Sequence, residues 1–539
     1  MTNLQSPISN DFQWGPGWRD QAWSELSQPW DMIVIGGGIT GAGVLREAAR
    51  AGLRVLLVEA HDFASGTSSR SSKLVHGGFR YLKNAQVRLT LESVRERELL
   101  LRQGRGLVNP LPFLLANFAG DHTPAWLFGV GLTIYDLLAL KWGHRHYAPD
   151  GVLGLCPQLA STNLLGGYRY FDASTDDARL VLRVIREAVL QGAMAINHAR
   201  VGSLLQGRDG RVCGVALQDL DPDRGGRTAE ATAQVVVSAA GVWADTLREH
   251  VGLPPRLRQL RGSHLVFAAA RLPLARAVTF LHPQDMRPVF AVPWEGVTIL
   301  GTTDVDHRAE LLTDPSMSAQ EAEYLLAAGH HAFPSLQLRL ADVLASFSGI
   351  RAVVDTGKAD PSKESREHVL WEEFGLLTVT GGKLTTFRRM AHSALRAVRA
   401  CLPSHPRFDP RGRVLDPLPA ESAVCGDLDA SQRLRLLGRY GADACPLSEN
   451  AGPGELLPIP GALALWAELR WAARAEGVVH LDDLLLRRVR LGLLLPRGGL
   501  DHLHRIRAIA QPELGWSDER WENEVVAYGK LWRRSYSLA

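Results

Sequence analysis

The pattern of apolar and polar positions predicts an α/β chain that carries an antiparallel sheet. Between Asp31 and Glu59, a short β-branched run, a group of glycines, apolar residues at helical spacing and a second apolar run follow one another. This order predicts a strand, a tight turn, a helix and a second strand. From Leu260 to Asp304 apolar and polar residues alternate in four runs, and Glu295-Gly296 separates the last two as a hairpin turn. An antiparallel sheet is therefore predicted within the α/β chain.

The rest of the pattern predicts helices and strands on both sides of that sheet. Helices are predicted at residues 89–104, 177–192 and 316–331, and strands at residues 193–205, 212–218 and 232–238. Past about residue 400 the sequence turns to Leu, Arg, Ala and Glu at helical spacing, with Pro-Gly pairs at 453–454 and 460–461. This change predicts a helical carboxy-terminal region.

The turn after the first strand has the spacing of a dinucleotide-binding loop. Gly36, Gly38 and Gly41 form a G-x-G-x-x-G set directly at a helix start. The first glycine allows the tight turn, the second lets a pyrophosphate approach bare backbone, and the third lets the helix lie close to the strand. Glu59 ends the second strand 21 residues after Gly38, where a carboxylate can bind a ribose hydroxyl. Because all these parts are in register, we interpret the unit as a nucleotide site rather than an ordinary glycine turn.

A long polar loop follows, from Ala60 to Leu82. It is dense in Ser, Thr and Gly, which makes it a poor helix or strand, and small residues let backbone lie against a flat ligand. Lys73, His76 and Arg80 give it positive charge. We interpret the segment as a functional loop rather than a solvated polar one.

Several motifs resemble those of one family. The run SSRSSKLVHGGFRYL at 68–82, behind a dinucleotide fold, resembles the signature of FAD-dependent glycerol-3-phosphate dehydrogenases. AAGVWAD at 239–245 resembles the second flavin-side segment of two-dinucleotide-binding-domain flavoproteins. RGSH at 261–264 is similar to the family's basic-Gly-Ser-His element, GTTD at 301–304 matches the family pattern, and TGGKLTTFR at 380–388 looks like its strand-to-helix entry. Together the motifs span most of residues 31–395.

The resemblance implies a fold class and a domain organisation. The fold is an α/β, FAD-binding Rossmann-like domain of the two-dinucleotide-binding-domain, glycine-oxidase-like type, with an inserted antiparallel β-sheet substrate domain and a C-terminal helical domain. We expect an N-terminal tail at residues 1–30, the oxidoreductase domain at 31–400 and the helical domain at 401–539. Within the oxidoreductase domain, the FAD-binding part is expected at about 31–100, 160–250 and 345–395, and the substrate sheet at about 251–344.

The resemblance also implies which residues bind FAD and substrate. The expected cofactor-binding residues are Gly36, Gly38, Gly41, Glu59, Thr67, Ser68, Ser72, Lys73, Leu74, His76, Gly77, Val201, Ala240, Gly241, Gly382, Leu384 and Thr385. The expected substrate-binding residues, carried by FRYL, SGIR, SREH and GGKLTT, are Arg80, Tyr81, Arg351, Arg366 and Lys383. Arg80, Arg351 and Lys383 are also expected to assist catalysis. Arginine forks and lysine suit glycerol 3-phosphate, since its phosphate carries close to two negative charges near neutral pH.

Oxidation of a secondary alcohol also needs a base, and two imidazoles occupy motif positions. His76 and His264 have an ordinary pKa that suits proton abstraction near neutrality. Neighbouring cations would disfavour the protonated imidazole and keep it basic. We favour His264 as the base and His76 as the residue at the flavin, and the sequence leaves the reverse assignment open.

Composition and charge narrow the function classes. Lys plus Arg total 60 and Asp plus Glu total 57, a net charge of +3, which argues against a nucleic-acid partner because such proteins carry a clustered basic excess. Five scattered cysteines without C-x-x-C spacing indicate neither a disulfide framework nor a metal site and fit a reducing cytoplasm. The first thirty residues lack the pattern of a signal peptide.

Two segments bear on membrane contact. Ala125–Leu140 is strongly apolar but falls short of the ~20 residues of a spanning helix and contains Asp136, so we expect either a core helix or a helix that dips into lipid. Asp482–Gly492 resembles the family's carboxy-terminal element and reads as a basic amphipathic helix, which would pack on neighbours or face a membrane or partner.

The resulting expectation is an enzyme that oxidises sn-glycerol 3-phosphate to dihydroxyacetone phosphate by hydride transfer to FAD N5. Electrons would pass to a membrane quinone, which places the protein in the cytoplasm or peripherally on the inner face of the cell membrane. The alternatives are an oxidase that uses oxygen, a flavin-bearing RNA-modifying or RNA-binding protein, and a NAD-dependent Rossmann enzyme. A homodimer is one assembly that the sequence leaves open, and so is covalent attachment of FAD.

Overall fold

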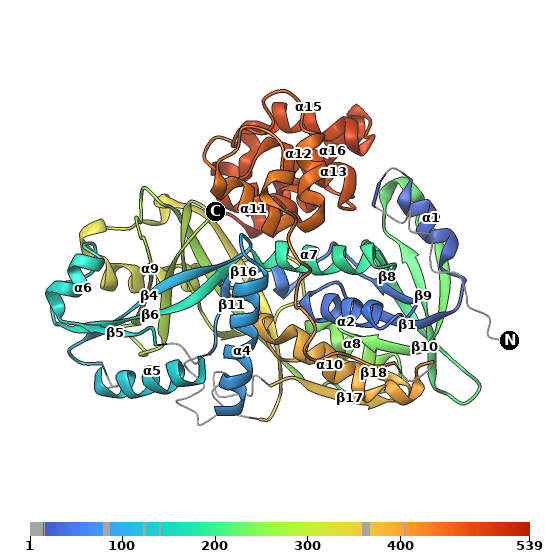
Figure 1. Ribbon diagram of the computed structural model, residues 1–539, viewed down its shortest axis with the longest axis horizontal. Helices are drawn as coiled ribbons and strands as arrows, with labels where there is room; N and C mark the ends of the chain where they lie inside the picture. The colour runs from blue at the N-terminus through green and yellow to red at the C-terminus, as the bar shows by residue number, and fades with distance from the viewer. Residues whose placement is uncertain are drawn as a thin grey trace.

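The chain folds into two sheets and a helical domain (Figure 1). The computed structural model describes residues 14–15, 17–78, 87–121, 125–139, 142–357, 367–403 and 406–538. In Figure 1 the carboxy-terminal helices, in orange and red, lie above the junction between the two sheets.

The first sheet is the nucleotide-binding type that the sequence predicts. Its strand order is β17 (Val369–Glu373), β18 (Leu376–Thr380), β10 (Thr228–Ser238), β1 (Trp30–Ile35), β2 (Val55–Val58) and β7 (Met194–Ile196). The strands from β18 to β7 are parallel, and β9 (Val212–Asp219) extends the sheet from β10 to β8 (Ala199–Gln206). Helix α2 (Ile39–Arg50) packs between α7 (Asp177–Leu190) and α10 (Phe387–Ala397). Strand β1 is an apolar run and is almost wholly buried, as expected for a parallel strand covered on both faces.

The second sheet is mostly antiparallel. Its strand order is β15 (Val305–Asp306), β11 (Leu257–Ala268), β14 (Val297–Gly301), β13 (Pro288–Trp294), β12 (Ala277–Leu281), β4 (Val108–Phe118), β6 (Leu164–Thr175) and β3 (Leu74–Val75). Strand β16 (Val343–Val354) pairs with β11, and β5 (Arg145–Tyr147) pairs with β6. The hairpin between β13 and β14 turns at Glu295-Gly296, as the sequence predicts. The surrounding helices are α4 (Val87–Gln103), α5 (Ala125–Ala139), α6 (Pro149–Leu155) and α9 (Ala319–Ala332). Helix α8 (Ala244–Glu249) lies instead with the first sheet, where Leu247 joins the buried apolar core.

This sheet recruits segments from outside the predicted insert at 251–344. Strands β4 and β6 precede the insert, and β16 extends beyond it to residue 354, although the sequence assigns residues 160–175 and 345–354 to the FAD-binding part. The sequence does not predict strand β4, because β4 contains Pro110 and Pro112 and proline is uncommon inside a strand. Both prolines lie where β4 pairs with β6 alone, before β12 joins at Phe113, so neither removes a hydrogen bond on a second side.

The helical domain contains α11 (Ala430–Tyr440), α12 (Ala444–Glu449), α13 (Trp466–Ala475), α14 (Leu491–Leu494), α15 (Leu503–Leu514) and α16 (Asp518–Ser535). Its apolar core is continuous with one face of the second sheet, since Trp294, Ile299 and Phe347 belong to the same buried cluster as Trp521 and Tyr528. The domain is therefore fixed to the sheet that bears β11, β14 and β16.

The predicted basic helix at Asp482–Gly492 is a buried connection between domains. Residues Asp483–Arg488 form a π-helical turn, and Arg487 and Arg488 are buried against Asp62 of the nucleotide-binding domain. Arg490 is buried too and donates to the carbonyl of Ser69. Packing on neighbours is thus the correct interpretation, and these arginines present no surface to RNA or lipid.

The described part of the amino-terminal segment is packed, whereas the sequence predicts a tail up to residue 30. Trp14 is buried and donates from Nε1 to the carbonyl of Ala195 at 3.1 Å. Helix α1 spans Trp18–Glu25, and its Arg19 pairs with the buried Asp219 at 2.5 Å. Tryptophans without helical or strand spacing gave no signal of this packing.

Helix α5 leaves much of its apolar surface in solvent. Trp126 is 67% exposed and Leu137 62% exposed, whereas Leu132 and Tyr135 on the inner side are buried. The expectation of a core helix is therefore wrong for the outer side of α5. Among the described residues, no helix combines the length and the apolar character needed to cross a bilayer.

Candidate functional site

A cavity of about 1140 Å³ lies where the two sheets meet. The carboxyl ends of β1, β2, β10 and β18 form one wall, and residues of β12, β13 and β16 form another. Ligands of open α/β sheets bind at the carboxyl ends of the strands. The volume exceeds the roughly 300–1,000 Å³ of ordinary small-molecule sites, so a dinucleotide and a small substrate can share it.

The glycine loop that lines this cavity has the shape of a pyrophosphate cradle. A Cβ on Gly36 would lie 2.5 Å from the carbonyl oxygen of Ala239, and one on Gly41 would lie 1.9 Å from that of Gly36. These positions therefore exclude any side chain, for the turn and for helix packing respectively. Gly38 faces the cavity itself, where a Cβ would approach Ser68 Oγ at 3.2 Å. The start of α2 behind it offers backbone N–H groups to an anion.

Glu59 lies at the end of β2, where the sequence places it. Its carboxylate accepts from the backbone N–H of Gly37 at 2.6 Å and of His61 at 2.8 Å, and the residue lines the cavity. Burial raises the pKa of Glu59, although these two hydrogen bonds act in the opposite direction. The backbone contacts fix the carboxylate beside the glycine loop, in the position expected for binding a ribose hydroxyl.

Cationic side chains line the cavity as well. Arg351, on β16, and Lys383, just after β18, both line it although they are 32 residues apart. The Arg351 guanidinium donates to Asp304 Oδ1 at 3.0 Å and to Thr302 Oγ1 at 3.1 Å. The structure thus brings two of the sequence-predicted substrate residues to the same space as the glycine cradle.

The two candidate histidines occupy different positions. His76 lines the cavity, whereas His264 is only 1% exposed and contacts the cavity wall through Ser72, whose Oγ lies 2.8 Å from His264 Nε2. The ring of His264 stacks on Phe347 at 4.6 Å between centroids. His264 can therefore exchange a proton with the cavity by way of the Ser72 hydroxyl, and His76 can do so directly.

Both imidazoles are held neutral. Burial, aided by Lys383 and Arg97, lowers the pKa of His76 to about 4, with Asp172 opposing. Burial, aided by Arg351 and Lys73, holds the pKa of His264 well below its ordinary value. The cations act as the sequence suggests, but burial contributes more.

A buried polar network supports the loop that carries His76. Tyr135 of α5 donates to Asp172 at 2.6 Å and accepts from the backbone N–H of Gly77 at 2.9 Å. Arg97 of α4 donates to the same Asp172 oxygen at 2.5 Å. This network fixes the backbone beside His76 and links it directly to α5.

Most sequence-predicted site residues line the same cavity. They are Gly36, Gly38, Glu59, Thr67, Ser68, Ser72, Leu74, His76, Val201, Ala240, Gly241, Arg351, Gly382, Lys383, Leu384 and Thr385. Gly41, Lys73, Gly77 and His264 do not line it and lie in the layer behind. Arg80, Tyr81 and Arg366 fall outside the described residues.

Lys73 has a different position from the one that the sequence predicts. Its ammonium is buried, and it donates to both carboxylate oxygens of Asp177 at 2.9 Å and to the carbonyl of Ser69 at 2.5 Å. Burial and the nearby Arg490 lower the pKa of Lys73 to about 7, although Asp177 opposes the shift. These contacts join the polar loop to the start of α7.

Other residues line the cavity although no sequence motif predicts a role for them. Arg287, Asp304, Asp172 and Arg200 line the cavity but stand outside the residues that sequence motifs assign to a role. Asp304 belongs to the GTTD motif, so that motif could have identified it. Arg287 follows an ordinary turn and precedes β13, and no spacing distinguishes it from a surface arginine.

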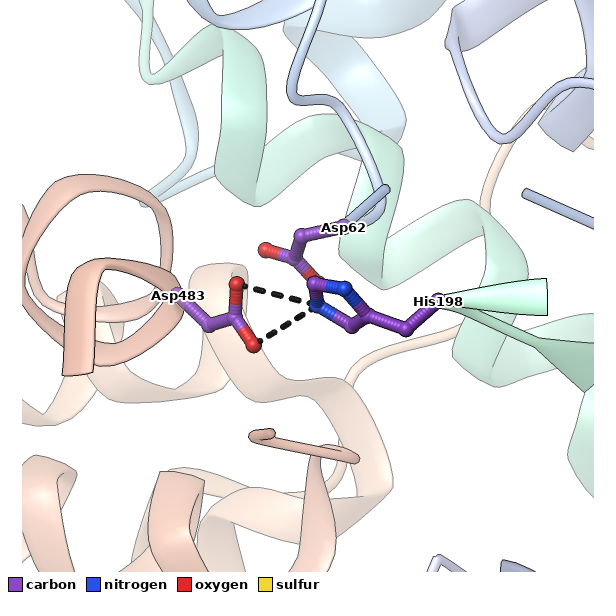
Figure 2. Close-up of side chains that lie close together, drawn as sticks. All are labelled: Asp62, His198 and Asp483. Atoms are coloured by element: carbon purple, nitrogen blue, oxygen red, sulfur yellow. Dashed lines mark hydrogen bonds and ion pairs between the residues drawn. The ribbon is translucent and has the colours of Figure 1, made fainter. Parts of the chain in front are cut away.

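Among the described residues, one cluster has the composition of a metal site. Asp62, His198 and Asp483 bring ligand atoms within 4.8 Å of one another (Figure 2). Their acceptors are already engaged. Asp62 accepts from Asn197, Arg487 and Arg488, and Asp483 accepts from Arg487 and from two backbone N–H groups, besides its contact with His198. We interpret the cluster as an ion-pair network that joins the nucleotide-binding and helical domains.

The fold and the cavity together define a class of protein. A glycine cradle and acid at the ends of parallel strands, closed by a second sheet, are typical of flavin-dependent oxidoreductases of this architecture. The family described as FAD dependent oxidoreductase matches residues 31–388, and the chain belongs to it. The family described as C-terminal domain of alpha-glycerophosphate oxidase matches residues 381–521.

Similar proteins narrow the class to one group. The chain is 35% identical over 541 residues to "Glycerol-3-phosphate dehydrogenase 2" of Mycobacterium tuberculosis, covering 95% of this chain and 90% of that protein. It is 38% identical over 388 residues to "Aerobic glycerol-3-phosphate dehydrogenase" of Bacillus subtilis, covering 71% of this chain and 69% of that protein. A solved glycerol-3-phosphate dehydrogenase from Bacillus halodurans complexed with FAD superposes with a TM-score of 0.78 at 29% identity, over 97% of this chain and 98% of that one. The chain is a member of the FAD-dependent glycerol-3-phosphate dehydrogenase family, which confirms the resemblance seen in the sequence.

Proposed function

We propose that the protein oxidises sn-glycerol 3-phosphate to dihydroxyacetone phosphate and passes the electrons to a membrane quinone. The observation that carries the proposal is the shared cavity, which is lined both by the pyrophosphate cradle and by the cations Arg351 and Lys383. A phosphorylated alcohol bound by these cations would present its carbon–hydrogen bond to a flavin that is anchored at the cradle.

The described residues fit FAD. Gly36 and Gly38 leave bare backbone that would hold the pyrophosphate, and Glu59 lines the cavity, where its carboxylate would accept from a ribose hydroxyl. The turn at Gly381-Gly382 brings backbone to the cavity with positive φ at both residues. When bound, FAD supplies the acceptor of the hydride at isoalloxazine N5. The protein supplies position, charge and a proton acceptor.

Arg351 and Lys383 bind the substrate phosphate in this proposal. A guanidinium offers a planar fork and an ammonium a point charge, and both suit a phosphate dianion. The pairing of Arg351 with Asp304 and Thr302 fixes the guanidinium before substrate arrives. Such preorganisation reduces the entropy that binding would otherwise cost.

The hydroxyl proton must leave as the hydride is transferred. We propose that His76 accepts it directly, because His76 lines the cavity and its pKa is lowered, so the imidazole is neutral. The sequence-based preference, His264, reaches the same space through Ser72. Comparison of Ser72→Ala with His264→Asn separates the two routes. Large and equal losses of turnover in both variants would identify His264 as the proton acceptor. A small loss of turnover in Ser72→Ala would identify His76 as the acceptor.

Helix α5 supports a quinone as the electron acceptor. Leu127, Val130 and Ile134 line the cavity mouth, and all three are also among the exposed apolar residues of the helix. An apolar carrier dissolved in lipid could therefore approach the cavity along α5 when this helix lies in the bilayer interface. Residues 125–140 include no lysine or arginine, so apolar contact rather than charge would provide the attachment.

The test uses the purified holoprotein without oxygen. Addition of sn-glycerol 3-phosphate should bleach the flavin absorbance, and a soluble quinone analogue should restore it. Glycerol, which lacks the phosphate, is the matched control and should leave the spectrum unchanged at equal concentration. Absence of bleaching would refute the oxidation of glycerol 3-phosphate.

The acceptor is tested separately. Turnover with the quinone analogue in the absence of oxygen should exceed peroxide release in air. The reverse ratio would assign the protein to the oxygen-using oxidases instead.

Arg351→Ala provides a third measurement. It should raise the KM for glycerol 3-phosphate and lower turnover while the flavin content stays normal, because Arg351 lies on β16 and is not part of the glycine loop. An unchanged KM would refute the phosphate-binding role.

A further inference from the structure

We infer that Arg287 is a further arginine of the phosphate subsite and that Asp304 positions it together with Arg351. This inference rests on the proposed function and deepens it. Arg287 and Asp304 both line the cavity beside Arg351, and neither belongs to the residues that the sequence motifs assign to the substrate.

One carboxylate holds both guanidinium groups. Asp304 Oδ1 accepts from Arg351 Nη1 at 3.0 Å, and Asp304 Oδ2 accepts from Arg287 Nη2 at 2.7 Å. Arg287 Nη1 also donates to the backbone carbonyl of Asp304 at 3.0 Å. Because the two oxygens of one carboxylate lie side by side, the two guanidiniums are brought together at the same point of the wall.

Burial differs between the carboxylate and its partners in the way that a binding subsite requires. The Asp304 side chain is 6% exposed, whereas those of Arg287 and Arg351 are 31% and 26% exposed. The negative charge is therefore covered, and the positive charges face the cavity. Since a guanidinium has five N–H donors, the two bonds from Arg287 to Asp304 leave three for a ligand.

The charges of the trio match a phosphate and not a neutral polyol. Two guanidiniums and one carboxylate sum to +1, and Lys383 adds a further positive charge to the same cavity. In the absence of ligand, Asp304 offsets the repulsion between the arginines. When a phosphate dianion binds, its oxygens accept from the forks on the side away from Asp304. Arg287 then contributes to selection of the phosphorylated alcohol over glycerol.

The three residues of this trio come from separate segments, two of them next to strand ends and one on a strand. Arg287 precedes β13, Asp304 follows β14, and Arg351 lies on β16. Strand β14 pairs with β13 and with β11, and β11 pairs with β16, so the sheet brings the three residues to the same end of these strands. The geometry of the subsite is therefore set by the paired strands as well as by the loops.

Arg287→Ala in the holoprotein is the test, with Arg271→Ala as a matched control. Arg271 also pairs with an aspartate, Asp342, at 2.8 Å and is 30% exposed, but it does not line the cavity. Arg287→Ala should raise the KM for glycerol 3-phosphate roughly ten- to a hundredfold, as expected for loss of hydrogen bonds to a charged group. The inhibition constant of inorganic phosphate should rise by the same factor, with flavin content unchanged, and Arg271→Ala should alter neither constant.

One further variant and one rescue experiment make the result decisive. Arg287→Lys keeps the positive charge but not the forked guanidinium. Its inhibition constant for inorganic phosphate should lie between those of the wild type and Arg287→Ala. Guanidinium ion added to Arg287→Ala at millimolar concentration should restore part of the lost affinity, which a purely structural role would not allow. If Arg287→Ala does not fold, the lysine variant carries the comparison.

Unchanged KM and phosphate inhibition in these variants would overturn the inference, as would a loss confined to kcat. Failure of the wild-type flavin to bleach with glycerol 3-phosphate would instead refute the proposed function. The Arg287 variants therefore test the inference, and the wild-type protein tests the proposed function.

Discussion

At the scale of single residues, we predict that Gly38 controls access of the cofactor to the cradle. Gly38→Val would put a branched side chain between the loop and Ser68, whose Oγ would already lie 3.2 Å from a Cβ. We expect the variant to fold but to purify without flavin, measured as the ratio of visible flavin absorbance to protein absorbance.

Gly202→Val is the control for this change. Gly202 lies on β8 in the same domain, is exposed, and a Cβ there would meet nothing closer than 3.9 Å. It should keep a normal flavin content. Flavin retained by Gly38→Val would show that the pyrophosphate does not lie against this glycine.

The pKa of His76 predicts the acid side of the pH profile. An imidazole acts as a base only when it is neutral, so activity should be lost as pH falls through its pKa. Because burial lowers that pKa from 6.5 to about 4, flavin reduction at saturating substrate should persist at pH 5.5 and decline near pH 4. Stopped-flow pH jumps without oxygen measure this rate before slow acid unfolding.

His76→Asn should remove the decline of the flavin-reduction rate near pH 4. The control, His250→Asn, changes an exposed histidine and should leave the pH profile as in the wild type. A wild-type profile that falls near pH 6.5 would contradict the lowered pKa. Saturating substrate is needed because the substrate phosphate itself ionises near pH 6.

The sequence identifies residues where spacing carries information and misses those where only the fold does. Gly36, Gly38 and Glu59 follow a fixed register, so their positions follow from one strand–turn–helix unit. Arg287 and Asp304 meet because separate strands pair side by side, and nothing in the local sequence shows that pairing. The same limit explains Lys73, whose positive charge was visible but whose partner, Asp177, was not.

At the scale of elements, strands and helices with clear periods are predictable, but their neighbours are not. The hairpin at Glu295-Gly296 and the strand-to-helix turn at Gly382 form as the sequence predicts. The pairing of β4 with β12 joins segments about 160 residues apart and leaves no mark on either segment. An apolar helix such as α5 is equally compatible with a core and with an exposed face.

The exposed side of α5 is testable as a lipid-binding surface. Replacing Trp126 and Leu137 together with serine removes two large apolar side chains that are 67% and 62% exposed. Sedimentation with vesicles of mixed phosphatidylcholine and phosphatidylglycerol should weaken by about tenfold or more, since each such side chain contributes roughly 1.5–3 kcal/mol when buried.

Turnover of the double variant with a soluble quinone analogue should stay normal, because neither residue lines the cavity. Val526→Ser on α16, 54% exposed, is the control and should bind vesicles like the wild type. Equal vesicle binding by all three proteins would exclude α5 as the attachment surface.

At the scale of the whole molecule, Asp62 fastens the helical domain to the nucleotide-binding domain. It accepts from both Arg487 and Arg488, and all three side chains are buried. Asp62→Ala would leave guanidinium charge buried without this partner, and removal of one member of a buried pair costs about 3–5 kcal/mol. Urea unfolding of the holoprotein should show a loss of that order in the free energy of unfolding.

Asp501→Ala tests the same chemistry at the surface. Asp501 pairs with Arg497, but the two side chains are 46% and 71% exposed, so the change should stay within about 0.5 kcal/mol. If both substitutions had equally small effects, the interdomain network would not contribute to stability.

The walls of the cavity come from stretches that begin at Ile35 and end at Thr385. A ribosome must therefore synthesise more than two thirds of the polypeptide before the pocket can be completed, so flavin capture has to wait for nearly the whole oxidoreductase portion to emerge. Once bound, the flavin would contact early and late parts of the chain at the same time. Its loss would therefore destabilise regions that lie hundreds of residues apart in the sequence.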